Sequence, residues 1–355
     1  MTRFRVLRPG VYSSIQDLGR HGYQRHGLSV SGAADKYSLR VGNLLLGNDL
    51  AAAAIETTLF GLELEVQSRS TIAVTGGDLG FAVNGKPAPT WTTLAVAPGD
   101  VLRFTGGPIG CRAYVCVKGG IDVPVQFGSR ATDSLVGLGG VSGRELKAGD
   151  EIGGFDPWAG TPEAPAGFAG ARHAANAFVS PPEIRGSGPS RSPSSSLGRR
   201  TQRRVLSPRW LQNRGEAQVI RVVFGPQEEA FSAEGIRTFL NSSYSVTPQS
   251  NHIGCHLEGP EIAHKHKADI LSECIPEGAI QVPASGKPIV LLAGRRGVGG
   301  YAKIANVISV DIPKIAQARP GDQVVFQSIS VQAAQALLVR QERYFRLMDR
   351  LVQHS

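Results

Sequence analysis

The stretch PGDVLRF at residues 98–104 has a near-copy, PGDQVVF, at residues 320–326, and both predict a turn followed by a β-strand. In each copy, Pro-Gly-Asp favours a tight turn, and the alternating residues after it are typical of a strand that leaves the turn. The copies lie in opposite halves of the chain. Because such turns are common, they only weakly indicate a duplicated fold.

Further runs with strand character outnumber those with helical character. They are TIAVTGG, FAVNG and RAYVCVKGG in the first half and VIRVVFG, SYSVTP, PIVLLAG and ANVISVDI in the second. Two helices are expected, one from about Ala33 to Leu46 with Gly47 as its end, and one from Val331 to Val352. With 44 glycines and 22 prolines, the chain is predicted to be mainly β with short helices.

The composition narrows the class of protein. A hydrophobic fraction of 41% over 355 residues allows one large or two modest domains with a packed core. No apolar signal opens the chain, and no stretch reaches the roughly 18 uncharged apolar residues of a membrane span, so we expect a cytoplasmic protein without a membrane partner. Four cysteines without a C-x-x-C pair are expected to stay reduced.

The excess positive charge is concentrated in one segment. The formal charge is +9, and residues 155–217 hold nine arginines against four acids, a net of +5. This distribution argues against a nucleic-acid-binding protein. The segment is rich in Pro and Ser and is interpreted as a disordered linker or insertion, with an arm for an anionic partner as the alternative. The predicted divisions are therefore 1–154, 155–217, 218–330 and a C-terminal helix at 331–355.

Polar residues and glycines cluster near the start, from Ser13 to Arg20 and again up to Asp35. They replace the apolar alternation of a packed strand, which favours a ligand-binding loop in which Arg20 and Asp35 present charge. The alternative is a pair of surface turns, with Asp35 only capping the following helix. Glu56 is either a buried acid or the solvated end of a strand.

A second cluster, GRRGVGGYAK at residues 294–303, follows an expected strand. As one loop, it would offer amides and cations to a phosphate or carboxylate, although a glycine-rich turn without a ligand fits nearly as well. No Walker motif occurs, because both Gly-Lys pairs precede proline. The spacing of His252, His256, His264 and His266 matches no zinc pattern, so no metal ion is predicted.

Several motifs, in order, resemble the KipA-like family, also called allophanate hydrolase subunit 2 or the biotin-dependent carboxyltransferase family, which includes the C subunit of bacterial 5-oxoprolinase. They cover nearly the whole chain except the Pro/Ser/Arg segment and the last helix. The motifs are QDLGR (16–20), SGAAD (31–35), NLLLGN (43–48), ETTLFG (56–61), FGPQ (224–227), SE (272–273), GAIQVP (278–283) and GGY (299–301).

The resemblance implies two cyclophilin-like β-barrel domains in tandem and a site shared with a KipI-like B subunit. With a further A subunit, such proteins open 5-oxoproline in an ATP-dependent hydrolysis. ATP is therefore the expected cofactor, bound at a shared interface. The alternatives are the carboxyltransferase component of a urea carboxylase-like system and a non-catalytic regulator of a kinase inhibitor. Biotin would have to come from elsewhere, because Met1 and Met348 are the only methionines and no Met-Lys-Met segment exists.

Opening a lactam requires cations for phosphate and a carboxylate that delivers water. The expected catalytic residues are Asp17, Arg20, Asp35 and Glu273. The expected substrate- or phosphate-binding residues are Gln16, Asn43, Glu56, Gln281, Gly299, Gly300, Tyr301 and Lys303. The chain departs from the family pattern at residues 250–254, where SNHIG stands in place of the usual Ser-Asp-Arg-Met-Gly, and at Val298 and Ala302.

Overall fold

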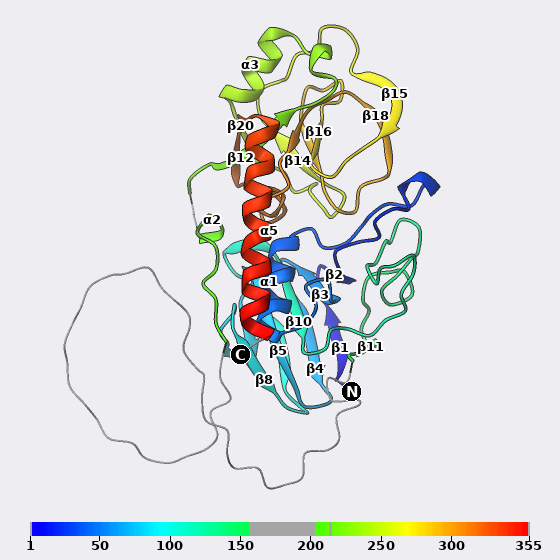
Figure 1. Ribbon diagram of the computed structural model, residues 1–355, viewed down its shortest axis with the longest axis vertical. Coiled ribbons are helices and arrows are strands. Elements are labelled where there is room, and N and C mark those ends of the chain that lie inside the picture. The colour runs from blue at the N-terminus through cyan, green and yellow to red at the C-terminus, as the bar shows by residue number, and fades with distance from the viewer. Residues whose placement is uncertain (1, 156–202, 213–214, 354–355) are drawn as a thin grey trace, which may run out of the picture.

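The computed structural model describes residues 2–155, 203–212 and 215–353. Two β-rich halves lie one above the other along the long axis, and helix α5 (Val331–Gln353) runs beside both of them (Figure 1). The mainly β prediction is confirmed. Within the described residues, no helix combines the length and apolar character needed to cross a lipid bilayer.

The first half contains two sheets. The six-stranded sheet has the order β11-β1-β4-β9-β6-β7, and the five-stranded sheet has the order β2-β3-β10-β5-β8. The strands of the first are β1 (Arg3–Pro9), β4 (Leu62–Val66), β6 (Phe81–Val83), β7 (Lys86–Pro87), β9 (Val101–Phe104) and β11 (Glu151–Gly153). Those of the second are β2 (Tyr12–Gln16), β3 (Ala54–Thr58), β5 (Ser70–Asp78), β8 (Thr93–Val96) and β10 (Ile109–Val117).

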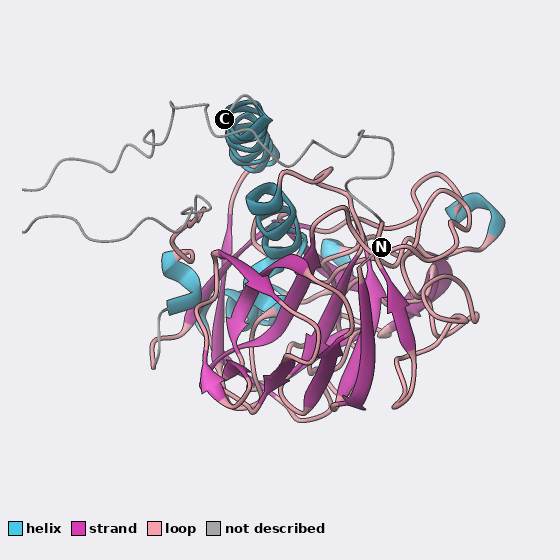
Figure 2. Cartoon of the chain, turned by 90° about the horizontal axis from the view of Figure 1, so that it is seen from below, coloured by secondary structure: helices cyan, strands magenta, loops and turns pink. Residues whose placement is uncertain are grey.

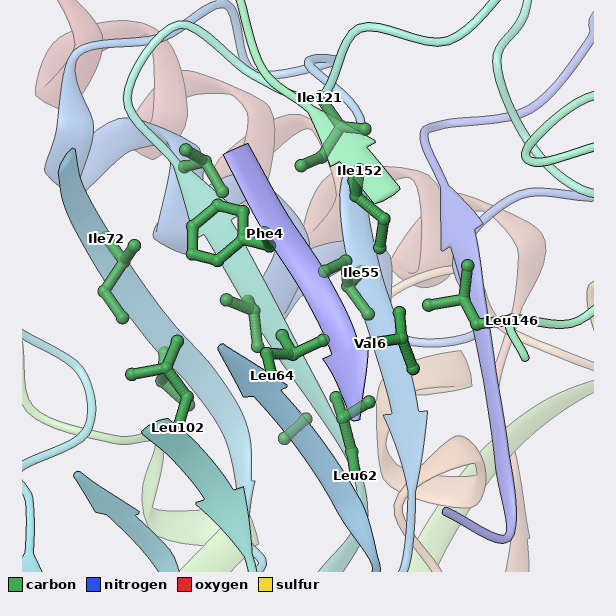
Figure 3. Packing of buried hydrophobic residues seen from close by; sticks show 14 of the residues in the cluster. Phe4, Val6, Ile55, Leu62, Leu64, Ile72, Leu102, Ile121, Leu146 and Ile152 are labelled. Carbon is green, nitrogen blue, oxygen red and sulfur yellow. The ribbon is translucent and has the colours of Figure 1, made fainter. Parts of the chain in front are cut away.

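Both sheets bury their apolar faces in one shared core. Along β4, buried and half-buried residues alternate, as expected for a strand with one face inward. Figure 3 shows Phe4 and Leu64 from one sheet packed with Ile55 and Ile72 from the other. Full burial of a side chain of this size contributes roughly 1.5–3 kcal/mol. This core holds the first half together as one unit.

The second half is a closed barrel in the order β12-β19-β16-β17-β14-β13-β20. The parallel pairing of β12 with β20 completes the ring. A two-stranded ribbon of β15 (Asp269–Cys274) and β18 (Val298–Tyr301) stands beside it. The barrel strands are β12 (Gln218–Phe224), β13 (Ser243–Val246), β14 (Gly254–Glu258), β16 (Ala279–Gln281), β17 (Ile289–Leu291), β19 (Lys303–Val307) and β20 (Gln323–Ser328).

Both predicted helices are present. The first, α1 (Lys36–Leu46), begins after Asp35, whose side chain accepts from the Ser38 amide at 2.9 Å, and it ends at Gly47 with φ +63°. These are the capping groups expected at the two ends of a helix. The remaining helices are short: α2 (Arg209–Gln212), α3 (Ala233–Asn241), α4 (Ile312–Ala316) and the 3₁₀ turns Gln24–His26 and Glu228–Ala230.

Helix α5 is attached to α1 by one buried aromatic residue and one ion pair. Phe345 is 1% exposed and packs edge-on against Tyr37. Arg40 lies over the Phe345 ring at 3.8 Å and donates two hydrogen bonds to Glu342 at 2.5 and 2.8 Å. In Figure 2, the helix that ends at the C-terminus is seen along its axis, outside the strands.

The structure confirms the turns predicted at the two Pro-Gly-Asp sequences. Gly99 and Gly321 adopt φ +89° and +94°, a left-handed conformation that favours glycine. Asp100 accepts a hydrogen bond from the Ala97 amide, and Asp322 accepts one from the Arg319 amide, both at 2.8 Å. The same type of turn therefore precedes β9 in one half and β20 in the other.

The loop predicted over Ser13–Arg20 is wrong for its first part, because Tyr12–Gln16 is strand β2. Ser13, Ser14 and Gln16 are fully buried instead of facing solvent. Ser13 Oγ donates to Thr57 Oγ1 at 2.9 Å, and Gln16 Nε2 donates to Ser14 Oγ at 2.9 Å. A packed strand tolerates these polar residues because each makes at least one hydrogen bond, although Gln16 Oε1 has no partner among the described residues.

Two further expectations change in the second half. The run ANVISVDI is a strand only as far as Val307, and α4 follows from Ile312. Residues 294–303 do not form one loop, since they divide into a turn, β18 and the start of β19. Arg295 is buried and donates to the Ile275 carbonyl at 2.9 Å, so its guanidinium binds a backbone carbonyl and not a phosphate.

Part of the predicted linker packs on the first half. The Thr93 amide donates to the Arg203 carbonyl and the Val205 amide to the Trp91 carbonyl, both at 2.9 Å. Leu211 is buried in the cluster that also contains Trp91. Residues 203–212 thus belong to the folded first half, whereas residues 156–202 and 213–214 lie outside the described part of the chain.

Candidate active site between the two halves

The side chain of Gln317, directly after α4, joins the two halves. Its Oε1 accepts from the amides of Cys111 and Arg112 at 2.9 Å each. Its Nε2 donates to Asp35 Oδ2 at 2.8 Å and to the Arg112 carbonyl at 2.9 Å. One buried amide therefore fixes the second half against β10 and against the start of α1.

Glu56 lies beside this junction and is fully buried on β3, opposite Tyr114 of β10. Its Oε2 accepts from Tyr114 Oη at 2.7 Å and from the Ala34 amide at 3.0 Å. Its Oε1 lies 3.7 Å from Arg112 Nε and 3.3 Å from His252 Nδ1. Burial opposes ionisation, but His252 and then Arg112 and Tyr114 outweigh it and lower the pKa of Glu56 to about 2.

Arg112 is committed to protein partners. It is 4% exposed, and its Nη1 donates to the Ala316 carbonyl and its Nη2 to the Asn251 carbonyl. Its Nε lies 3.7 Å from Glu56 Oε1, in ion-pair range but without a hydrogen bond. Arg112 therefore holds the second-half backbone against the first half and supplies charge to Glu56.

His252 lies between Glu56 and an open pocket. Its ring faces Tyr12, with ring centroids 6.1 Å apart and planes 28° apart. The 3.3 Å contact of Nδ1 with Glu56 is within ion-pair range, although it is not aligned as a hydrogen bond. Nε2 is buried and has no hydrogen-bond partner among the described residues.

The pocket has a volume of about 330 Å³ and is walled by both halves. Most of the wall is apolar, and a few polar groups converge on it, which is the usual composition of a small-molecule site. The polar side chains include Tyr12, Thr58, Arg112, Asp133, Ser250 and His252.

Two of the predicted catalytic residues, Asp17 and Arg20, lie in a buried network beside this pocket. Asp17 accepts from the Gly19 amide and from Ser129 Oγ at 2.7 Å each, and from the Arg130 amide at 2.6 Å. Arg20 is 0% exposed and lies 3.8 Å from the pocket residue Asp133. In the structure, both side chains organise the loop that carries Asp133.

The other first-half candidates lie around the junction. Asp35 caps α1 and binds Gln317, and burial raises its pKa. Asn43 donates to the Ala52 carbonyl at 2.7 Å, and Gln16 donates to the Thr132 carbonyl at 3.2 Å. Of the first-half candidates, Glu56 makes direct contact with the pocket residue His252.

The second-half candidates gather at the ribbon of β15 and β18, not at the pocket. Lys303 Nζ lies 2.5 Å from Glu273 Oε1 and, with Gln227, lowers the pKa of Glu273. Gln281 Nε2 reaches the Tyr301 carbonyl at 3.5 Å. A Cβ on Gly299 would lie 2.3 Å from the end of the Ile275 side chain, so a larger residue there would displace that side chain, and Gly300 and Tyr301 complete β18. The structure therefore divides the predicted site residues between two places.

Among the described residues, no group of three or more His, Cys, Asp and Glu could hold a metal ion. The four histidines do not converge. His264 Nε2 contacts the Val282 carbonyl at 3.0 Å and its ring packs on Phe231, whereas His252 contacts Glu56.

Sequence reasoning missed Arg112, Tyr114 and Gln317. A signal was present on β10, where Ala113 and Val115 face the core while Arg112 and Tyr114 point to the opposite face. A charged residue in such a run predicts a partner on that face. No pattern pointed to Gln317.

Comparison with known proteins gives one family. Residues 26–328 match the family described as carboxyltransferase domain, subdomain A and B. The C subunit of the 5-oxoprolinase of Haemophilus influenzae is 32% identical over 340 residues, which are 96% of this chain and 96% of that protein.

The urea amidolyase of Lachancea kluyveri is 31% identical over 98% of this chain but only 18% of its own length. The crystal structure of the urea carboxylase of Kluyveromyces lactis superposes with a TM-score of 0.79 at 28% identity, covering 98% of this chain and 29% of that one. The chain therefore spans less than a third of these two longer proteins.

Proposed function

Because this chain belongs to the carboxyltransferase domain family with subdomains A and B, we propose that it acts as the C subunit of an ATP-dependent amide or lactam hydrolase of the 5-oxoprolinase type. The observation that carries the proposal is the match over 96% of both chains with a protein named as the C subunit of 5-oxoprolinase. The urea amidolyase match, in contrast, is confined to 18% of a longer protein.

The pocket between the halves fits this chemistry. Ring opening of a lactam needs a group that takes a proton from water and one that returns a proton to nitrogen. The pocket places an imidazole against a buried carboxylate, and its hydroxyl groups and apolar wall suit a small amide. A volume of about 330 Å³ leaves room for a lactam and attached groups.

The partners that we propose are a KipI-like B subunit and an A subunit. No phosphate-binding loop of the Walker type occurs in the sequence, and Arg112 and Arg295 are engaged by backbone carbonyls. We therefore place ATP at a surface shared with the partner subunits. This chain would supply the pocket, and its partners would supply the rest of the nucleotide site.

Transfer of a carboxyl group is the second candidate function. It is favoured by the superposition with the urea carboxylase at a TM-score of 0.79. In that case biotin would arrive on another protein, since the sequence has no Met-Lys-Met segment. A regulator without catalytic activity is the third candidate.

Product analysis separates these functions. The chain is mixed with its candidate A and B subunits, ATP and 5-oxoproline, and glutamate is measured. Glutamate that appears only when this chain is present supports the proposal. A stable complex that makes no glutamate but decarboxylates carboxybiotin would favour carboxyl transfer, and a complex without either activity would favour the regulator.

A further inference from the structure

We propose that helix α5 is the surface on which a partner subunit docks, and that the partner contributes an apolar helix or groove flanked by acidic side chains. This inference rests on the proposed function, because it gives one of the partner subunits a place on the chain. Helix α5 begins at Val331, beyond the residues 26–328 that match the family, and it lies at the outer edge of the molecule (Figure 2).

The inner side of α5 is fixed to the first half at several points. Phe345 is buried against Tyr37, and Glu342 pairs with Arg40. In the last turn, the Val352 carbonyl accepts from the guanidinium of Arg203 at 3.4 Å. A helix held at both its middle and its end presents its remaining side chains to a partner in a fixed arrangement, which lowers the entropic cost of docking.

A different side of α5 carries a narrow apolar seam. Tyr344, Leu347 and Leu351 are 39%, 58% and 49% exposed. They are three and four residues apart, so their side chains lie on one side of the helix. Leu337, which is half-buried, continues the seam one heptad nearer the start of the helix. Anchors with this spacing are typical of a helix that packs against another helix or enters an apolar groove.

The charges around the seam select the kind of partner. Arg340 lies on the seam between Leu337 and Tyr344, Arg343 and Arg350 lie beside it, and all three arginines are exposed. A partner surface with acidic side chains would complement them. A second copy of this chain would bring the same arginines to the contact, and the repulsion between like charges argues against self-association through α5.

The width of the seam argues against a lipid surface. A helix that lies in a membrane interface buries a broad apolar face. Here the apolar residues form a line of heptad spacing, which is the narrower pattern of a helix–helix contact. Exposed Arg343 and Arg350 stand directly beside that line. A protein groove fits this pattern better than a bilayer does.

The test measures the binding of the full chain to each candidate partner subunit by isothermal titration calorimetry. Leu347→Ser removes one anchor of the seam. Val339→Ser is the matched control, because Val339 lies on the same helix, is 48% exposed and points away from the seam. We expect the dissociation constant for one subunit to rise about 10-fold or more in Leu347→Ser and to change by less than about twofold in the control. Both side chains are exposed, so the Tm of each variant should equal that of the native chain.

A second variant tests the charge argument. Arg343→Glu combined with Arg350→Glu reverses the charge beside the seam and should raise the same dissociation constant about 10-fold or more at low salt. Added salt should weaken the binding of the native chain, because exposed charges are screened. A subunit that binds the charge-reversed variant as tightly as the native chain would overturn the acidic partner.

Docking and activity can fail separately. If the complex makes glutamate and Leu347→Ser binds as tightly as the native chain, the proposed function stands and the inference is overturned. If the complex makes no glutamate but Leu347→Ser prevents its assembly, the inference stands and the proposed function fails. The inference is also overturned if the native chain binds neither subunit, if it instead forms dimers that Leu347→Ser disperses, or if the seam instead binds vesicles that contain phosphatidylserine.

Discussion

Replacing Glu56 by Gln tests the electrostatics of the junction. The pKa of Glu56 lies at about 2 against an ordinary 4.5. This difference corresponds to about 3 kcal/mol of folding free energy at neutral pH. Because the folded-state pKa is depressed, the contribution is complete above about pH 4.5 and is lost as the pH falls towards 2. Less than half of it remains at pH 3.

The assay is urea denaturation of the native chain and Glu56→Gln at several pH values between 7 and 2.5. At pH 7 the variant should be less stable by about 3 kcal/mol or more, since buried Arg112 also loses its counter-charge. The difference in unfolding free energy between the native chain and Glu56→Gln should fall by more than half at pH 3. Glu258→Gln is the matched control, because this exposed carboxylate pairs with Lys287 at the surface and should cost below about 1 kcal/mol. A gap for Glu56→Gln that stays constant from pH 7 to 2.5 would refute the reasoning.

Further predictions concern the contacts between elements. Gln317→Ala removes four hydrogen bonds and leaves buried backbone groups unpaired. Urea titrations should therefore show that the free energy of unfolding falls by about 2–4 kcal/mol. A loss below about 0.5 kcal/mol would contradict the role of this residue. Phe345→Ala removes the ring that packs between α5 and α1. The free energy of unfolding should fall by about 3–5 kcal/mol, and the amides of α5 should exchange faster than in the native chain. Asp311→Asn disrupts the paired bonds to Arg221, and calorimetry should show a loss of about 1–3 kcal/mol in the second half, whereas an unchanged Tm would contradict it.

The parts of the fold that were predictable from sequence depend on neighbours along the chain. The turns at Gly99 and Gly321 and the cap of α1 at Asp35 use residues within a few positions of one another. Helix α5 follows from the spacing of its apolar residues, and Phe345 is the member that becomes fully buried.

The strand Tyr12–Gln16 could not be predicted in this way. Its polar side chains are satisfied by Thr57 and by the carbonyl of Thr132, which are distant in sequence. Without those partners, the composition resembles that of a loop.

The candidate site depends even more on long-range contacts. Glu56 was expected to bind substrate, but its environment comes from Ala34, Arg112, Tyr114 and His252. His252 approaches Glu56 across the two halves, and Gln317 sets that approach. The contacts of Glu56, His252 and Gln317 depend on how the two halves pack against each other, and no local sequence pattern predicts that packing.

The most direct test of the account is the rate of ATP hydrolysis by this chain mixed with its candidate A and B subunits, with and without 5-oxoproline. The account predicts that 5-oxoproline raises the rate only when this chain is present in the complex. A complete complex whose ATP hydrolysis is the same with and without 5-oxoproline would contradict it.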